Sequence, residues 1–169
     1  VVQLDRDPAV GELLSACAAH RLVVLIGSSG AGKTVVAKRA AEDVAVSTDV
    51  LWFSGGRLRS GYLEAFAQHQ GLGHPLQETL SHGRCRHGLV VIDGAEKLRE
   101  EDDLKEAAML LTLLGMQHQG CTWRLVMTCR AEEWDRVQSE LARHSGHRME
   151  WTPVRLSLPD FDELSPVWE

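Results

Sequence analysis

The eight residues 27–34 constrain the fold of this chain more than any other part of its sequence. They read Gly-Ser-Ser-Gly-Ala-Gly-Lys-Thr and match the pattern GxxxxGK[ST] at every fixed position. An apolar run, residues 22–26, precedes them, and a stretch of helical character, residues 33–44, follows. A loop of this composition between a strand and a helix turns backbone N–H groups toward phosphate groups, and the positive end of the helix dipole faces them. The sequence therefore predicts a phosphate-binding loop.

The pattern gives each residue of this loop a part in holding a nucleoside triphosphate. Lys33 is expected to reach the β- and γ-phosphates, which also makes it a candidate catalytic residue. The Thr34 hydroxyl is expected to ligate Mg²⁺. The residues expected to surround the nucleotide are Gly27, Ser28, Ser29, Gly30, Ala31, Gly32, Lys33, Thr34 and Val35.

A second buried run, residues 89–92, ends at Asp93. A carboxylate at the end of a neighbouring strand can hold Mg²⁺ from the side opposite Thr34, directly or through water. Apolar strands also end in Asp simply because a turn follows. A purely structural role for Asp93 is therefore the alternative. With the phosphate-binding pattern 59 residues before Asp93, the metal role is the preferred interpretation.

Two more charged residues follow strand-like segments. Glu96 comes three residues after Asp93, where a carboxylate could orient or deprotonate an attacking water. Arg130 ends a predicted strand, where a positive group would face the γ-phosphate between the two motifs. The structural alternatives are a solvated loop acid for Glu96 and a surface Arg for Arg130. We take both as candidate catalytic residues.

Short apolar runs alternate with longer amphipathic stretches along the whole chain, which predicts a parallel sheet covered by helices. The expected fold class is α/β: one domain over residues 1–169, a three-layer P-loop NTPase core with a five-stranded, mainly parallel sheet in the order 5-1-4-3-2. The expected strands are 22–26, 50–53, 89–92, 124–128 and 154–158. The expected helices are 7–20 with Asp7 as N-cap, 33–44, 61–70, 75–81, 101–119 and 132–143.

The composition of the chain argues against several classes of protein. The net charge of −6 does not indicate a non-specific nucleic-acid binder, whose surface would normally be basic. No apolar run is long enough to cross a bilayer. The four cysteines form no CxxC pair, which favours reduced thiols in the cytoplasm. The segment 82–87, rich in His and Arg, lacks a second ligand pair at zinc spacing and is expected to be a polar loop.

With these motifs in place, the chain resembles the nucleotide-binding core of STAND NTPases, the NACHT/AP-ATPase group that is related to AAA+ proteins. The opening segment, with Arg6, resembles the part of that family that packs beside the adenine, although Asp5 replaces the usual Gly. The stretch LVVIDGAEKL places Glu96 at the family's acidic position, and Lys97 stands where the family usually has Glu. The strand ending in Thr-Cys-Arg130 resembles the family's sensor-1 strand, and residues 154–162 resemble its last core strand.

The resemblance implies an ATP- or ADP-binding, Mg²⁺-dependent switch in a signalling or defence protein. It implies self-association through the full-length protein, with effector and sensor domains outside this segment, and weak or absent hydrolysis by the segment alone. Two alternatives stay open: an AAA+ ATPase of a DNA-handling system, and a nucleotide-binding module without turnover. A GTPase is less favoured, because the guanine-reading NKxD motif needs an Asn and the chain contains none.

Overall fold

The computed structural model describes the chain except for residues 1–6, 71–75, 77–79, 81–86, 116–121 and 158–169. Five parallel strands form one sheet in the order β2-β3-β4-β1-β5. This confirms the predicted fold class and strand order. The strands are β1 Leu22–Gly27, β2 Asp49–Ser54, β3 His87–Asp93, β4 Thr122–Arg130 and β5 Thr152–Leu156.

The helices agree with the prediction in place and differ at their ends. Helix α1 has Asp7 as its first residue rather than as its N-cap, a difference of one position that is normal at a helix end. Of the helix predicted over 75–81, the structure describes only Leu76 and Leu80, which are both helical and buried. The helices are α1 Asp7–Ala19, α2 Lys33–Ala45, α3 Tyr62–His69, α5 Glu101–Gly115 and α6 Trp134–Ser145, with single 3-10 turns η1 Gly55–Arg57, η2 Ala95–Lys97 and η3 Ala131–Glu133.

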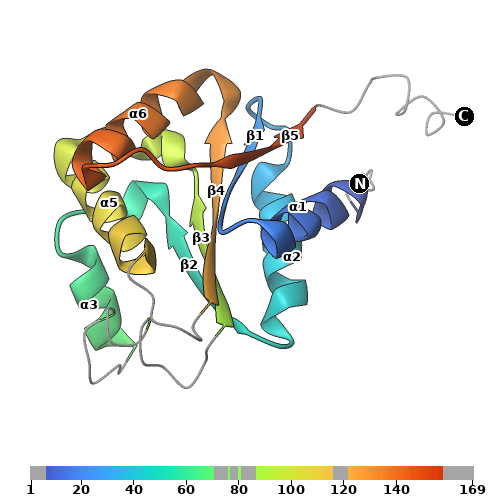
Figure 1. The fold of residues 1–169 in the computed structure, drawn as a ribbon, viewed down its shortest axis with the longest axis horizontal. Helices are drawn as coiled ribbons and strands as arrows, with labels where there is room; N and C mark the ends of the chain where they lie inside the picture. Colours follow the sequence, from blue (N-terminus) through green and yellow to red (C-terminus); the bar gives the residue numbers. More distant parts are fainter. Residues whose placement is uncertain (1–6, 71–75, 77–79, 81–86, 116–121, 158–169) are drawn as a thin grey trace, which may run out of the picture.

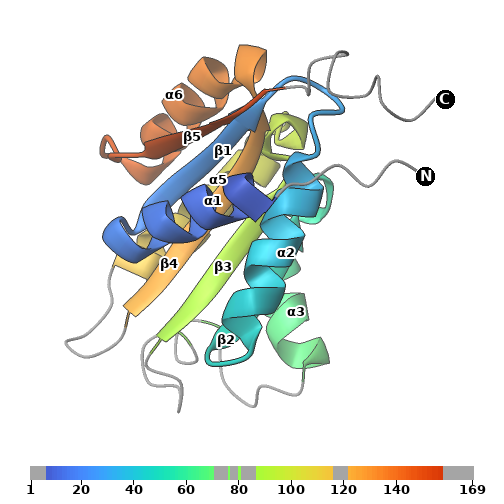
Figure 2. The ribbon, with the colours of Figure 1, turned by 90° about the vertical axis from the view of Figure 1, so that its right-hand side faces the viewer.

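The helices cover both faces of the sheet (Figures 1 and 2). Helices α1 and α2 lie on one face, and α3, α5 and α6 lie on the other. Successive residues of the central strands therefore point into different cores: Val23 and Leu25 pack with α1 and α2, whereas Val24 and Ile26 pack with the other layer. A strand that is buried on both faces reads as an unbroken apolar run, which is why β1, β3 and β4 were visible in the sequence.

A buried carboxylate joins α5 to α3. Glu106 on α5 is 7% exposed, and its carboxylate oxygens accept hydrogen bonds from the backbone N–H groups of Leu63, at 2.8 Å, and Gly61, at 3.3 Å. These amides belong to the first turn of α3, where a helix leaves its N–H groups unpaired. Glu106 thus caps α3 from another helix.

We expect Glu106→Ala to lower the free energy of unfolding by about 1–3 kcal/mol, because the buried amide of Leu63 and the partly buried amide of Gly61 lose their acceptor. Glu101→Ala is the matched control: it lies on the same helix, but its side chain is 65% exposed and pairs with Lys105. Urea unfolding of both variants measures the difference. An equal, small effect of the two substitutions would show that Glu106 does not support α3.

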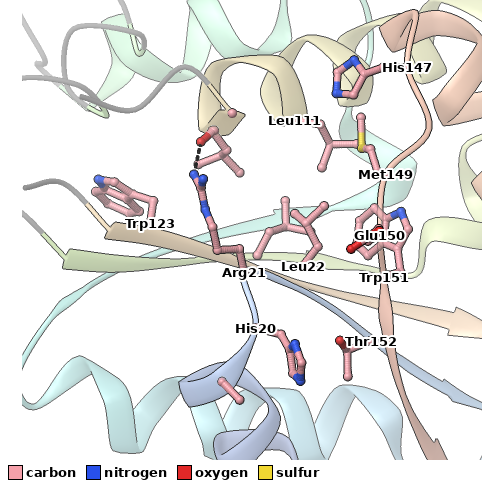
Figure 3. A pocket seen from close by; sticks show the side chains of 14 residues that line it. His20, Arg21, Leu22, Leu111, Trp123, His147, Met149, Glu150, Trp151 and Thr152 are labelled. Carbon is pink, nitrogen blue, oxygen red and sulfur yellow. Dashed lines mark hydrogen bonds between the residues drawn. The ribbon is translucent and has the colours of Figure 1, made fainter. Parts of the chain in front are cut away.

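The amino-terminal edge of the sheet contains a cavity of about 670 Å³, shown in Figure 3. Its walls include Leu22, Leu111 and Trp151, and Arg21 at its side donates to the carbonyl oxygen of Leu114 at 2.6 Å. Parallel strands place this cavity at the end opposite to the phosphate-binding loop. No helix in the described part of the chain combines the length and apolar character needed to span a bilayer.

Candidate nucleotide-binding site

The predicted phosphate-binding loop joins the carboxyl end of β1 to the amino end of α2. Gly30 and Gly32 adopt φ values of 79° and 85°, a left-handed conformation that only glycine enters at low cost. The side chain of Ala31, between them, is fully buried in the core, and its N–H bonds to the carbonyl oxygen of Ser28 at 3.3 Å. Ser28 and Ser29 are exposed. The local sequence thus produces the turn that the pattern predicts.

Lys33 lies against this loop. Its Nζ donates to the carbonyl oxygens of Gly27, at 2.8 Å, and Ser28, at 2.7 Å. The ammonium group is therefore held at the mouth of the loop, where a phosphate group bound by the loop would meet it. Val35, in the first turn of α2, is 50% exposed and presents an apolar surface beside the loop.

Thr34 and Asp93 meet as the sequence predicts. The Thr34 hydroxyl lies 2.9 Å and 3.1 Å from the two carboxylate oxygens of Asp93. The Thr128 hydroxyl, from β4, donates to Asp93 Oδ1 at 2.7 Å and accepts from the N–H of Gly94 at 2.8 Å. Thr128 is 1% exposed, so it fixes the carboxylate from inside the sheet.

Glu96 and Arg130 also come together at this edge. Glu96 lies on η2, and its Oε1 is 3.7 Å from Nε of Arg130. Its side chain is only 14% exposed, and its Oε2 is buried without a hydrogen-bond partner. Arg130 is beside Gly27 in the register of β4 with β1, and its side chain is 45% exposed. A partly buried carboxylate with a free oxygen and an accessible guanidinium thus lie at the same edge of the sheet as the loop.

A hollow of about 500 Å³ opens between α2 and the edge strand β2. Thr34 and Asp93 lie in its wall, together with Trp52 and Lys38. Solvent therefore has access to Thr34 and Asp93 through this hollow.

These residues fit a nucleotide with Mg²⁺. Magnesium usually takes one or two protein oxygen ligands and completes its shell with phosphates and water. Thr34 and Asp93 offer one hydroxyl and one carboxylate at hydrogen-bonding distance. No group of three or more His, Cys, Asp or Glu that could hold a metal by itself is found among the described residues.

Cys129, between Thr128 and Arg130, takes no part in this chemistry. Burial, with a smaller contribution from the charge of Glu96, raises the pKa of its thiol to about 12. Burial likewise raises the pKa of Cys17 to about 11. Both thiols are therefore neutral at physiological pH, and a neutral, buried thiol is not a nucleophile.

Other predicted residues lie outside the described part of the chain. Arg6, expected beside the adenine, is among them, and so is the His- and Arg-rich segment apart from His87. Sequence reasoning missed the contribution of Thr128, although a polar residue near the end of the buried β4 run was a usable signal. It also missed Arg136 on α6, whose guanidinium donates to the carbonyl oxygen of Glu96 at 3.3 Å and which no local pattern marks.

The fold and the loop together define the class: this is the α/β core of P-loop NTPases, with the phosphate-binding loop, Asp93 and Glu96 at the carboxyl edge of one parallel sheet. No family model matches the sequence, and no curated protein matches it either.

Several solved structures of replication initiators share this fold. Domain III of the replication initiation protein DnaA from Thermotoga maritima has a TM-score of 0.61 at 15% identity, over 96% of this chain and 66% of that one. A DNA replication initiation factor has a TM-score of 0.59 at 16% identity, over 98% and 50%. DnaA bound to AMPPCP and single-stranded DNA has a TM-score of 0.58 at 15% identity, over 94% and 48%.

Likeness at these identities shows the fold alone, and the chain spans about half to two thirds of the length of these structures. It agrees with the P-loop NTPase fold that the sequence predicts. The narrower STAND/NACHT assignment stays a prediction.

Proposed function

We propose that this chain binds ATP and Mg²⁺ at the loop of residues 27–34 and hydrolyses ATP slowly, as the ATPase core of an AAA+-related protein. The observation that carries this proposal is the contact of the Thr34 hydroxyl with Asp93, 2.9 Å apart, beside a loop that already holds the Lys33 ammonium group. The Lys33 and Thr34 side chains, at the start of α2, and the Asp93 carboxylate, at the end of β3, thus converge beside the loop that follows β1.

The chain's own residues divide the work of hydrolysis. Lys33 and the loop amides bind the phosphates and stabilise their negative charge. Magnesium, held by Thr34 and Asp93, would neutralise charge on the β- and γ-phosphate oxygens. Glu96 orients a water molecule and takes one of its protons while the water oxygen bonds to the γ-phosphorus. The bond from that phosphorus to the β–γ bridging oxygen breaks, and ADP and phosphate leave. Arg130 faces the charge that develops on the γ-phosphate.

Nucleotide binding should be visible as thermal stabilisation. At about 100 times Kd, Mg·ATP or Mg·ADP should stabilise the fold by about 2.7 kcal/mol, which for a domain of this size raises Tm by roughly 5–11 °C. Removing magnesium with EDTA should reduce the shift, because Thr34 and Asp93 then lose their link to the phosphates. Differential scanning fluorimetry with ATP, ADP, GTP and GDP measures both effects. No shift with any nucleotide would rule the proposal out, and a larger shift with guanine nucleotides would overturn the preference for adenine.

A DNA-handling role is the second candidate. The observation that favours it is the likeness to a replication initiator solved with both AMPPCP and single-stranded DNA. The STAND-type switch has different support, namely the sequence stretch LVVIDGAEKL and the strand that ends at Arg130.

A DNA titration, together with sedimentation, separates the DNA-handling role from the STAND-type switch. Labelled single-stranded DNA is titrated with the protein in Mg·AMPPCP at several salt concentrations and followed by fluorescence anisotropy. Affinity that falls steeply with salt favours the DNA-handling role. No binding, together with ATP-dependent self-association in sedimentation, favours the switch.

A further inference from the structure

Arg136, on helix α6, reaches across to the turn that carries Glu96. Its Nη1 donates to the carbonyl oxygen of Leu98 at 3.1 Å, and its Nη2 donates to that of Glu96 at 3.3 Å. Its Nε donates to the Glu133 carboxylate at 2.8 Å, a contact that lowers the pKa of Glu133. The guanidinium of Arg136 thus links α6, which carries it, to η3, to η2 and to the residue that follows η2.

The turn η2 has little support of its own. It is a single 3-10 turn, whose internal hydrogen bonds run from Lys97 to Gly94 and from Leu98 to Ala95, both 3.0 Å. Turns of this length are not stable by themselves and take their orientation from their surroundings. The direction in which Glu96 points thus depends on groups outside η2.

The guanidinium of Arg136 suits this task. It is planar and carries its donors in a fixed fork, so one group can bind two carbonyl oxygens that lie two residues apart in the chain. Within the part of the chain that the structure describes, the ion pair of the Glu96 carboxylate is the 3.7 Å approach to Arg130, and it does not hold the main chain of η2. Arg136 therefore contacts the main chain of Glu96 itself, whereas Arg130 contacts its carboxylate.

We propose that Arg136 is a positioning residue for Glu96: by binding the carbonyl oxygens on both sides of Lys97, it fixes η2 so that the Glu96 carboxylate is held at the γ-phosphate side of the loop. This inference rests on the proposed hydrolysis, in which Glu96 orients the attacking water. In this proposal Arg136 acts through the main chain of η2 and not on the nucleotide or the water. A shift of about 1 Å at such a carboxylate can change a rate by up to about a hundredfold.

Helix α6 offers a matched control for the test. Arg143 lies on the same helix and also pairs with a glutamate three residues before it, Glu140, but none of its hydrogen bonds reaches η2. We expect Arg136→Gln to lower the single-turnover rate of ATP hydrolysis at least about tenfold. The Kd for Mg·ATP should stay within about twofold, because the loop and Thr34 are untouched. Arg143→Gln should match the parent in both. Arg136→Lys should restore only part of the rate, since an ammonium group lacks the fork.

A double substitution separates positioning from a general loss of structure. If Arg136 acts through Glu96, adding Arg136→Gln to Glu96→Gln lowers the rate no further. An equal fall in both backgrounds, or a Kd that weakens as much as the rate falls, would overturn the proposal.

If the parent protein binds Mg·ATP but releases no phosphate, the proposed hydrolysis is wrong. Amide hydrogen exchange then tests separately whether Arg136 holds η2. Faster exchange at Lys97 and Leu98 in Arg136→Gln, and not in Arg143→Gln, would support its hold on η2. Unchanged exchange would overturn it.

Discussion

Replacing Glu96 with Gln should lower the rate of ATP hydrolysis at least about a hundredfold while Mg·ATP binding stays within about twofold of the parent. The amide keeps the size of the side chain but cannot take a proton from water. The effect should be on the rate alone, because the proposed phosphate contacts come from the loop and Lys33, whereas the Glu96 carboxylate lies beside Arg130. Single-turnover release of labelled phosphate gives the rate, and isothermal titration with Mg·AMPPCP gives the affinity.

Glu100→Gln is the control for this experiment. Glu100 is an exposed carboxylate four residues further along the chain, so it changes the net charge equally without entering the site. We expect it to hydrolyse ATP like the parent. If Glu96→Gln did so too, Glu96 would be a structural acid, and a group other than Glu96 would activate the water.

Removing the ammonium group of Lys33 should have the other large effect. Lys33→Ala should abolish most of the nucleotide-induced stabilisation, about 2.7 kcal/mol at 100 times the parent's Kd, because the charge that faces the phosphates is gone. The fold should persist, since the Lys33 side chain bonds only to carbonyl groups of its own loop. Circular dichroism checks the fold, and the melting shift with Mg·ADP measures binding.

Lys105→Ala serves as the control for Lys33. Lys105 is an exposed lysine on α5 that pairs with Glu101, so its loss changes the net charge without touching the loop. A melting shift with Mg·ADP equal to the parent's is expected. Nucleotide stabilisation that survived Lys33→Ala unchanged would place the phosphates somewhere other than this loop.

The parts of the site that sequence predicted are those set by local spacing. The glycine pattern requires the left-handed turns at Gly30 and Gly32, and parallel pairing of β1, β4 and β3 brings Asp93 to the same edge. The strands themselves were predictable because burial on both faces leaves unbroken apolar runs.

The rest of the site depends on how elements pack. Thr128 bonds to Asp93 because of the register of β4 with its neighbours. Arg136 reaches η2 because of the way α6 lies on the sheet. Neither is a property of nearby sequence. The same holds for Glu106, a charged residue on an otherwise apolar helix face that is buried because it caps α3.

The strand order also has a consequence for the order in which the protein matures during synthesis. In the sheet, β1 lies between β4 and β5, so Leu22 stands beside Leu125, and Val23 stands beside Val126 and Thr152. The ribosome therefore produces the phosphate-binding loop before either of the two strands that pair with β1. Until then, the apolar strand β1 has no partner in the sheet, and such exposed apolar segments are prone to aggregate. The loop is thus fixed in place only after β4 and β5 have been made.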